Sequence, residues 1–256
     1  MKNKPTATAR TIAYIAVMTA LLIGAQFALS FVAGVEVVTV LLLCFAAYFG
    51  VITGVATAVS FCTLRLFIWG FAPNVVILYY IYYPLFALLF GFLGKIKEDT
   101  FDKAKAGLAI AVNALLVIIT ASALYCAIGN VIKISRLYKV TVEIFLYVVA
   151  GLGGALIITF NVFYALVKLK ILKSGKPLKL FMLTAVATIC TILFTLLDDI
   201  ISPLIVGMDS LTALTYFYGS FLAMLPQAVC TVATVTTLYF PLTFALTKAC
   251  GKSILY

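Results

Sequence analysis

The amino-acid sequence predicts an all-α fold, a polytopic bundle of transmembrane helices. Hydrophobic residues make up 65% of the 256 residues, and the mean hydropathy is +1.23. Charged residues make up only 10% of the chain, against about 25% in a typical soluble domain. Apolar stretches long enough to span a bilayer recur from one end of the chain to the other. We therefore expect residues 1–256 to form a single integral membrane domain.

Eight hydrophobic segments follow one another along the chain. The second and third segments meet at Gly50 with almost no loop, because the stretch from Val35 to Gly70 is too long for one ordinary span. Gly50 and Gly54 favour a tight turn at this junction. The segments cover approximately residues 12–32, 35–49, 52–70, 76–95, 106–128, 145–168, 181–201 and 214–247.

The basic residues predict which side of the membrane each loop faces. They gather at the N-terminus, after the fourth segment, after the sixth segment and at the C-terminus. With eight crossings these four groups fall on one side, which the positive-inside rule makes the cytoplasm. We therefore expect a multi-pass protein of the cell membrane with both termini cytoplasmic. The net charge of +10 then reflects topology, and no basic stripe on a soluble face indicates nucleic-acid binding.

The stretch 104–172 fits this scheme least well. Its loop carries three basic residues between positions 133 and 139, on the side assigned to the exterior. The fifth and sixth segments form either an extra hairpin or a stretch that lies on the membrane surface. Asn113 and Asn161 fall at similar depth in the two segments, which favours a hydrogen bond between them.

Strongly polar residues inside membrane segments indicate a functional site, because they are costly there. Counting 1.5 Å per residue places most of them in the outer halves of their segments. We interpret this clustering as a cavity that opens to the exterior and binds a small molecule. The candidate substrate-binding residues are Gln26, Glu36, Thr39, Arg65, Asn74, Tyr79, Tyr83, Asp198 and Gln227.

Arg65 is the most informative of these residues, since a guanidinium at this depth needs a carboxylate, carbonyls or an anionic ligand. Two interpretations stay open for it, an ion pair with Glu36 and direct contact with the ligand. Asp198 and Asp199 are either solvated at the interface or a cap on a cationic or hydrogen-bonding ligand.

Four tyrosines cluster in the outer part of the fourth segment. They form either an interfacial aromatic belt or a stacking wall for a ring-shaped ligand. Because four tyrosines so close together on a helix cannot all face lipid, we expect Tyr79 to point inward with Tyr82 or Tyr83.

Several kinds of chemistry are not expected of this chain. It contains no His, and its six Cys residues include no C-x-x-C pair, so we expect no metal site and no cofactor. Gly251-Lys252-Ser253 resembles the end of a phosphate-binding loop but lacks the loop's first Gly and a preceding strand. We expect a protein that is not an enzyme, driven by an ion gradient, a substrate gradient or another polypeptide.

Small residues recur at every fourth position of the first segment, at Ala16, Ala20, Gly24 and Ala28. This spacing puts them on one helix face. Small side chains let the backbone of another helix come close in lipid, so this face is a candidate docking strip for a partner.

The order of several motifs resembles that of a known family. The first 95 residues combine a basic N-terminus, the run Ile15–Leu22, the segment Val35–Thr39 and the tight junction Phe49–Gly54. The stretch from about residue 184 to 248, including Tyr218–Phe221, is similar in pattern to the last two helices of the same family. Together these features resemble the substrate-binding S component of an energy-coupling factor (ECF-type) ABC transporter.

The resemblance implies a function and partners. The S component would bind a small vitamin-like or micronutrient ligand, and a transmembrane coupling (T) subunit with two cytoplasmic ATPases would drive its import. The Ala-x-x-x-Ala pattern by which this family contacts the coupling subunit matches Ala16 and Ala20, and Gly24 extends it. The family's six-helix core would comprise residues 1–103 and 173–256, with 104–172 as an inserted helix pair.

Two other functions remain open from the residues alone. One is an autonomous secondary transporter, in which Arg65, Glu36 or Asp198 would couple ions to transport. The other is an intramembrane enzyme acting on a lipid, for which only Asp198 and Asp199 offer neighbouring carboxylates.

Overall fold

The computed structural model describes residues 7–32, 35, 37–96, 106–129, 136–171 and 175–250. Within these residues every regular element is an α-helix, which confirms the all-α class. An apolar chain in a bilayer favours helices because each helix satisfies its backbone hydrogen bonds internally. The described helices are α1 (Ala7–Leu29), α2 (Val38–Phe49), α3 (Val51–Trp69), α4 (Pro73–Gly94), α6 (Ala106–Ile128), α7 (Arg136–Lys168), α8 (Lys176–Val206) and α9 (Ser210–Cys250).

Seven of the described helices are long and apolar enough to cross a membrane, as expected for a multi-pass membrane protein. The helix α2 is the exception, because its 12 residues extend only about 18 Å, less than the hydrocarbon core of about 30 Å. It contacts α1, α3, α4, α8 and α9, and Leu42, Leu43 and Ala46 are fully buried. The segment expected at 35–49 is therefore a short helix in the core of the bundle.

Although it is short, α2 reverses the direction of the chain between α1 and α3. At the start of α2, Val38 lines the same cavity as Ala25 and Leu29 near the end of α1. At the other end, the ring of Phe49 lies 5.0 Å from the ring of Tyr14 near the start of α1. The helix therefore runs antiparallel to α1, and the alternation of direction expected for the first segments is present.

Gly50 forms the tight turn between α2 and α3 that the sequence predicts. Its φ of +88° is a conformation that favours glycine, and it is the single residue between the two helices. The helix α4 packs closely on this turn, because a Cβ at Gly91 would lie 2.7 Å from the Cα of Val51. This contact fixes the first turn of α3, whose last turns carry Arg65 and Trp69.

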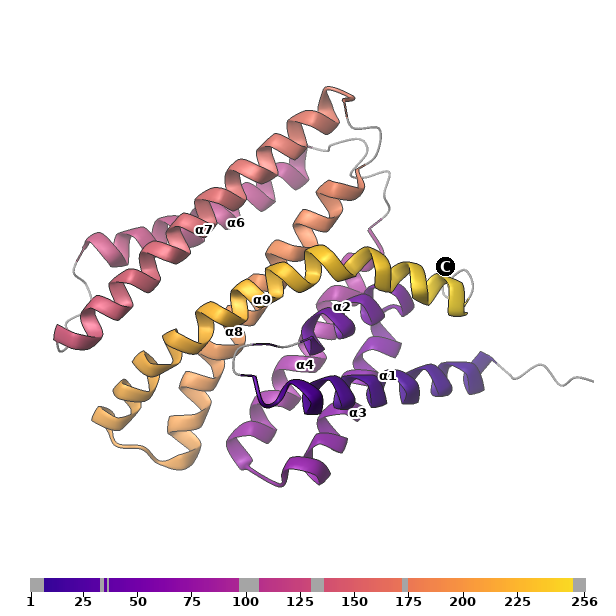
Figure 1. Cartoon of the computed structure of the whole chain (residues 1–256), viewed down its shortest axis with the longest axis horizontal. Helices are drawn as coiled ribbons and strands as arrows, with labels where there is room; N and C mark the ends of the chain where they lie inside the picture. Colours follow the sequence, from indigo (N-terminus) through magenta and orange to yellow (C-terminus); the bar gives the residue numbers. More distant parts are fainter. Residues whose placement is uncertain are drawn as a thin grey trace, which may run out of the picture.

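The helices α6 and α7 form a pair at the side of the bundle, where α7 contacts α8 and α9 (Figure 1). Asn113 and Asn161 exchange amide hydrogen bonds of 3.1 and 2.7 Å, so the expected bond is present. Gly153 allows a close approach, since a Cβ there would lie 3.2 Å from the Cβ of Thr120 and closer still to its hydroxyl. These contacts show that α6 and α7 pack on each other as a helix pair.

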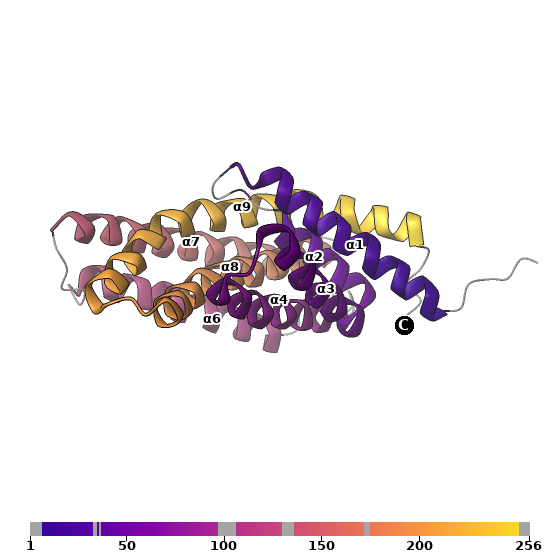
Figure 2. The same ribbon diagram turned by 90° about the horizontal axis from the view of Figure 1, so that it is seen from below.

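Basic residues from several loops gather at one end of the bundle. The Nζ of Lys179 donates a hydrogen bond of 3.2 Å to the carbonyl of Ile96, which joins the start of α8 to the end of α4. Lys95 lines a pocket with Thr11 from the first turns of α1. The last turns of α9, with Lys248, lie beside the start of α1 in both views (Figures 1 and 2). We call this the basic end of the bundle.

Candidate functional site

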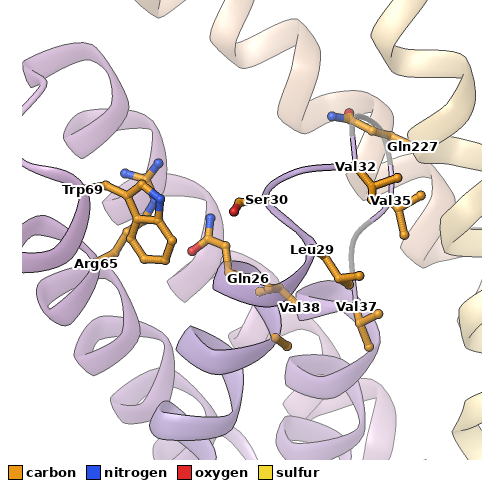
Figure 3. A pocket seen from close by; sticks show the side chains of 11 residues that line it. Gln26, Leu29, Ser30, Val32, Val35, Val37, Val38, Arg65, Trp69 and Gln227 are labelled. Carbon is orange, nitrogen blue, oxygen red and sulfur yellow. The ribbon is translucent and has the colours of Figure 1, made fainter.

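A cavity of about 310 Å³ lies at the end of α1 away from the basic end, and Figure 3 shows the side chains that line it. It is lined by the last turns of α1, the chain around the start of α2, the end of α3, and α9. Three of the predicted binding residues, Gln26, Arg65 and Gln227, reach it from three different helices. The other lining residues are Ala25, Leu29, Ser30, Val32, Val35, Val37, Val38 and Trp69.

Tyr79 on α4 links Gln26 to Arg65. The Nε2 of Gln26 donates a hydrogen bond of 3.0 Å to the Tyr79 hydroxyl. The guanidinium carbon of Arg65 lies 4.1 Å from the centroid of the Tyr79 ring and 5.6 Å from that of Trp69, within the distance of cation–π contacts. One tyrosine therefore joins α1, α3 and α4 beside the cavity.

Two polar atoms here are buried with no hydrogen-bond partner among the described residues, the Nε of Arg65 and the Oε1 of Gln26. A cation–π contact contributes about 0.5–2 kcal/mol, but an aromatic face accepts no conventional hydrogen bond from the buried Nε–H. The ring contacts of Arg65 therefore do not replace the missing acceptor. No described carboxylate pairs with it, and Glu36 lies outside the described residues, so that predicted ion pair stays a prediction.

Aromatic rings from α4 and α8 pack behind Tyr79. The ring of Tyr83, which is 3% exposed, lies 4.9 Å from the ring of Tyr79. The ring of Phe194 lies 5.8 Å from Tyr79 and 4.8 Å from Tyr82, while Tyr80 is exposed. Tyr79, Tyr82 and Tyr83 thus point inward. Tyr83 is not among the described lining residues of the cavity but packs against Tyr79.

Asn74 and Asp198 come together in a second polar group, outside the described lining of the cavity. The Nδ2 of Asn74 donates to the Oγ of Ser202 at 2.9 Å, and this hydroxyl donates to Oδ1 of Asp198 at 2.6 Å. The Tyr216 hydroxyl donates to Oδ2 of Asp198 at 2.7 Å. Both carboxylate oxygens are engaged, which favours a structural role for Asp198 in joining α4, α8 and α9. Thr39 is buried in α2 and is not among the described residues that line the cavity.

Gln227 reaches the cavity from α9 and is held by a row of hydroxyl groups. Its Oε1 accepts a hydrogen bond of 3.2 Å from Thr195 on α8. One turn further along, Thr191 and Thr231 share a hydrogen bond of 2.9 Å. This row along the α8–α9 interface was not predicted, although residues spaced three and four apart on a helix share a face. The members on α8 are Thr184, Thr188, Thr191 and Thr195.

The face of small residues on α1 is uncovered. Ala16, Ala20, Gly24 and Ala28 are all exposed, and no described atom lies within 4 Å of the position that a Cβ on Gly24 would take. A different face of the same helix carries Leu22, which is fully buried in the core. The helix therefore presents one face to the bundle and its small residues to the surroundings.

A scan against protein-family models and searches of curated proteins and of solved structures found no match. The fold and the site define the class of protein: a multi-pass membrane protein with a polar cavity at one end of its helices. The particular function is inferred from the chemistry of that cavity and from the family resemblance of the sequence.

Proposed function

We propose that the chain is the substrate-binding S component of an ECF-type transporter in the cell membrane. The cavity captures a small vitamin-like or micronutrient ligand from outside, and a T subunit with two cytoplasmic ATPases drives import. The chain itself carries out no covalent chemistry and needs no cofactor. The observation that carries this proposal is the cavity itself, where Gln26 and Arg65 hold buried polar atoms that lack partners among the described residues.

The position of the basic end supports the orientation that this function requires. Lysines near the ends of α4, α7 and α9 and the start of α8 lie at or beyond membrane spans, and basic residues favour the cytoplasmic side. With the basic end in the cytoplasm, both termini lie there too and the cavity faces outward. The helix α6 packs mainly on α7, and α7 contacts α8 and α9, which supports a six-helix core with residues 104–172 as an inserted pair.

The uncovered face of small residues on α1 supports the proposal that a helix of the coupling subunit binds there. Ala16 and Gln26 are ten residues apart, which is about 15 Å along the helix. Ala16 and Ala20 therefore lie toward the basic end, where a coupling subunit attached to cytoplasmic ATPases would bind. Gly24 lies between this contact and the cavity.

The test is to replace Ala16 and Ala20 with Leu in protein co-expressed with the coupling subunit and ATPases. We expect ATP-dependent uptake to fall at least tenfold while ligand binding by the isolated chain is unchanged, since the bulky side chains block only helix approach. Ala114→Leu, at an exposed small residue on α6, is the matched control. Loss of binding in the Ala16 and Ala20 variants would mean that this face only packs within the bundle.

An autonomous secondary transporter is the second candidate, and one observation favours it. Asp199 is buried within the long helix α8 and its Oδ1 has no partner among the described residues, while its Oδ2 accepts a hydrogen bond of 2.7 Å from Ser220. Buried carboxylates in membrane helices are common in ion-coupled transport. Gradient-driven uptake by the purified chain alone in liposomes would favour this candidate over the S component.

A further inference from the structure

Arg65 brings an unmatched positive charge to the cavity, as it is the one charged side chain among the described lining residues. The rings of Tyr79 and Trp69 attract the cation, but they do not replace an acceptor for its N–H groups. Its Nε is buried without a described partner. The described lining residues therefore supply no anionic group at this position, and Glu36 lies outside the described residues.

The shape of a guanidinium selects among anions. Its Nε–H and one terminal N–H form two parallel donors that match the two oxygens of a carboxylate. A phosphate ester carries close to two negative charges at neutral pH, and the described lining offers only one cation to compensate them. A monocarboxylate fits the charge of this cavity better than a phosphate does.

Gln26 adds a second requirement for the ligand, because only one of its two amide atoms has a described hydrogen-bond partner. Its Nε2 donates to Tyr79, which leaves Oε1 buried without a described partner. Turning the amide over would let Tyr79 donate instead and would still leave one polar atom unpaired. In the orientation observed, Oε1 is a hydrogen-bond acceptor that an N–H or O–H group would satisfy.

The rest of the described lining is largely apolar and limits the size of the ligand. Trp69 presents an indole ring beside Arg65, and Leu29, Val37 and Val38 line the wall near the start of α2 (Figure 3). The volume of about 310 Å³ is at the lower end of the range for small-molecule pockets. Such a cavity suits a single ring system better than a large conjugate.

We propose that the cavity binds a small monocarboxylate built on one ring system, with a hydrogen-bond donor that faces Gln26. The carboxylate pairs with Arg65 and the ring packs against Trp69. This inference rests on the proposed function, because it names the ligand class of the same cavity.

The chain contains one Trp, Trp69, so its intrinsic fluorescence reports on the cavity directly. The purified full-length protein in nanodiscs would be titrated with two acid–amide pairs, benzoate with benzamide and pyrrole-2-carboxylate with pyrrole-2-carboxamide, and with phenyl phosphate. We expect each acid to bind at least tenfold more tightly than its amide and than phenyl phosphate. Pyrrole-2-carboxylate, which carries an N–H donor, should bind more tightly than benzoate. Equal binding of acids and amides, tighter binding of phenyl phosphate, or no response to either acid would overturn the proposal.

Variants separate the two contacts. Arg65→Gln should weaken binding of the acids by about tenfold to a hundredfold and binding of the amides much less, so that the preference for acids is lost. Arg65→Lys should keep part of the acid preference, because it keeps the charge but loses the fork. Gln26→Leu should remove the advantage of pyrrole-2-carboxylate over benzoate. The control Arg10→Gln, at the opposite end of α1, should change none of these values, and an Arg65→Gln protein that still prefers acids would refute the role of Arg65.

The inference and the proposed function fail in different ways. Acid binding by the isolated chain without ATP-dependent uptake in the presence of the coupling partners would support the ligand class and refute the S-component function. Mass spectrometry of the ligand that co-purifies gives the converse test. A cationic or uncharged nutrient that is imported with the partners would support the function and refute the ligand class.

Discussion

Replacing Gly91 with Ala tests whether the bundle depends on the close approach of α4 to the turn between α2 and α3. An added Cβ would lie 2.7 Å from the Cα and 2.8 Å from the N of Val51, whereas ordinary van der Waals contact begins at 3.4 Å. The helices must therefore separate by about 0.7 Å, the difference between 3.4 and 2.7 Å. Because the obstacle is backbone, no side-chain rotation relieves it.

The magnitude follows from two opposing effects. Overpacking of this kind costs about 1–3 kcal/mol, and contact with backbone favours the upper part of that range. The higher helix propensity of Ala returns about 1 kcal/mol. We expect Gly91→Ala to lower the free energy of unfolding by about 1–2 kcal/mol. Gly154→Ala is the matched control, since no described atom lies within 4 Å of its added Cβ, and it should be neutral or stabilising.

Unfolding by SDS in mixed micelles, followed by circular dichroism, measures both variants. Labelling of Cys44 and Cys62, each 1% exposed, gives a second readout, because separation of α4 from the turn should speed their reaction with a thiol reagent. Gly91→Ala with wild-type stability, or an equal loss in Gly154→Ala, would refute the reasoning.

Two further predictions concern the ends and the side of the bundle. Asn113→Leu leaves Asn161 without its interhelical partner and should destabilise the α6–α7 pair by about 0.6–2 kcal/mol in SDS unfolding; the double change to Leu should recover part of this loss, because no unpaired amide remains. At the start of α9, hydrogen bonds from the Thr212 hydroxyl and backbone lower the pKa of Asp209. The stabilisation by this N-cap is therefore complete above the unfolded-state pKa of Asp209 and is lost as the pH falls through the lower folded-state pKa. Asp209→Asn should remove this acid-dependent part of the unfolding curve, and an unchanged curve would contradict the assignment.

Hydropathy predicted which segments are helical but not which of them face lipid. The segment around 35–49 is as apolar as its neighbours, yet it forms the short core helix α2. Apolar side chains satisfy a lipid-facing and a buried position equally well, so composition could not distinguish the two. The glycine signal at Gly50 was more informative, because a positive φ has a specific steric cause.

The sequence likewise predicted the position of some residues of the candidate site but not of others. Counting residues along each helix gave depth, and Gln26, Arg65 and Gln227 do meet around one cavity. Depth says nothing about which way a helix face turns, so Asn74 and Asp198, expected in the same cavity, lie in a separate hydrogen-bonded group.

The row of threonines on α8 was missed for a different reason. Thr188 and Thr191 each donate a hydrogen bond to the carbonyl four residues earlier, which lets a hydroxyl sit in an apolar helix at little cost. Threonines in an apolar helix therefore carry little energetic cost and do not stand out in the sequence as candidate functional residues. Only their regular spacing indicates that they share the interface with α9.

The helix α1 connects the two halves of the proposed function. It carries Gln26 at the cavity and the exposed Ala16 and Ala20 toward the basic end, and it is a single unbroken helix over that length. In the proposed function, a ligand that satisfies the Gln26 amide oxygen would act directly on this helix, and a partner seated on Ala16 and Ala20 would contact the same helix. Binding of ligand and binding of partner can therefore influence one another only if each has a different affinity for two positions of α1 relative to the core. The proposed function therefore requires differential contact through α1 if nutrient binding is to stimulate ATP hydrolysis by the proposed partners.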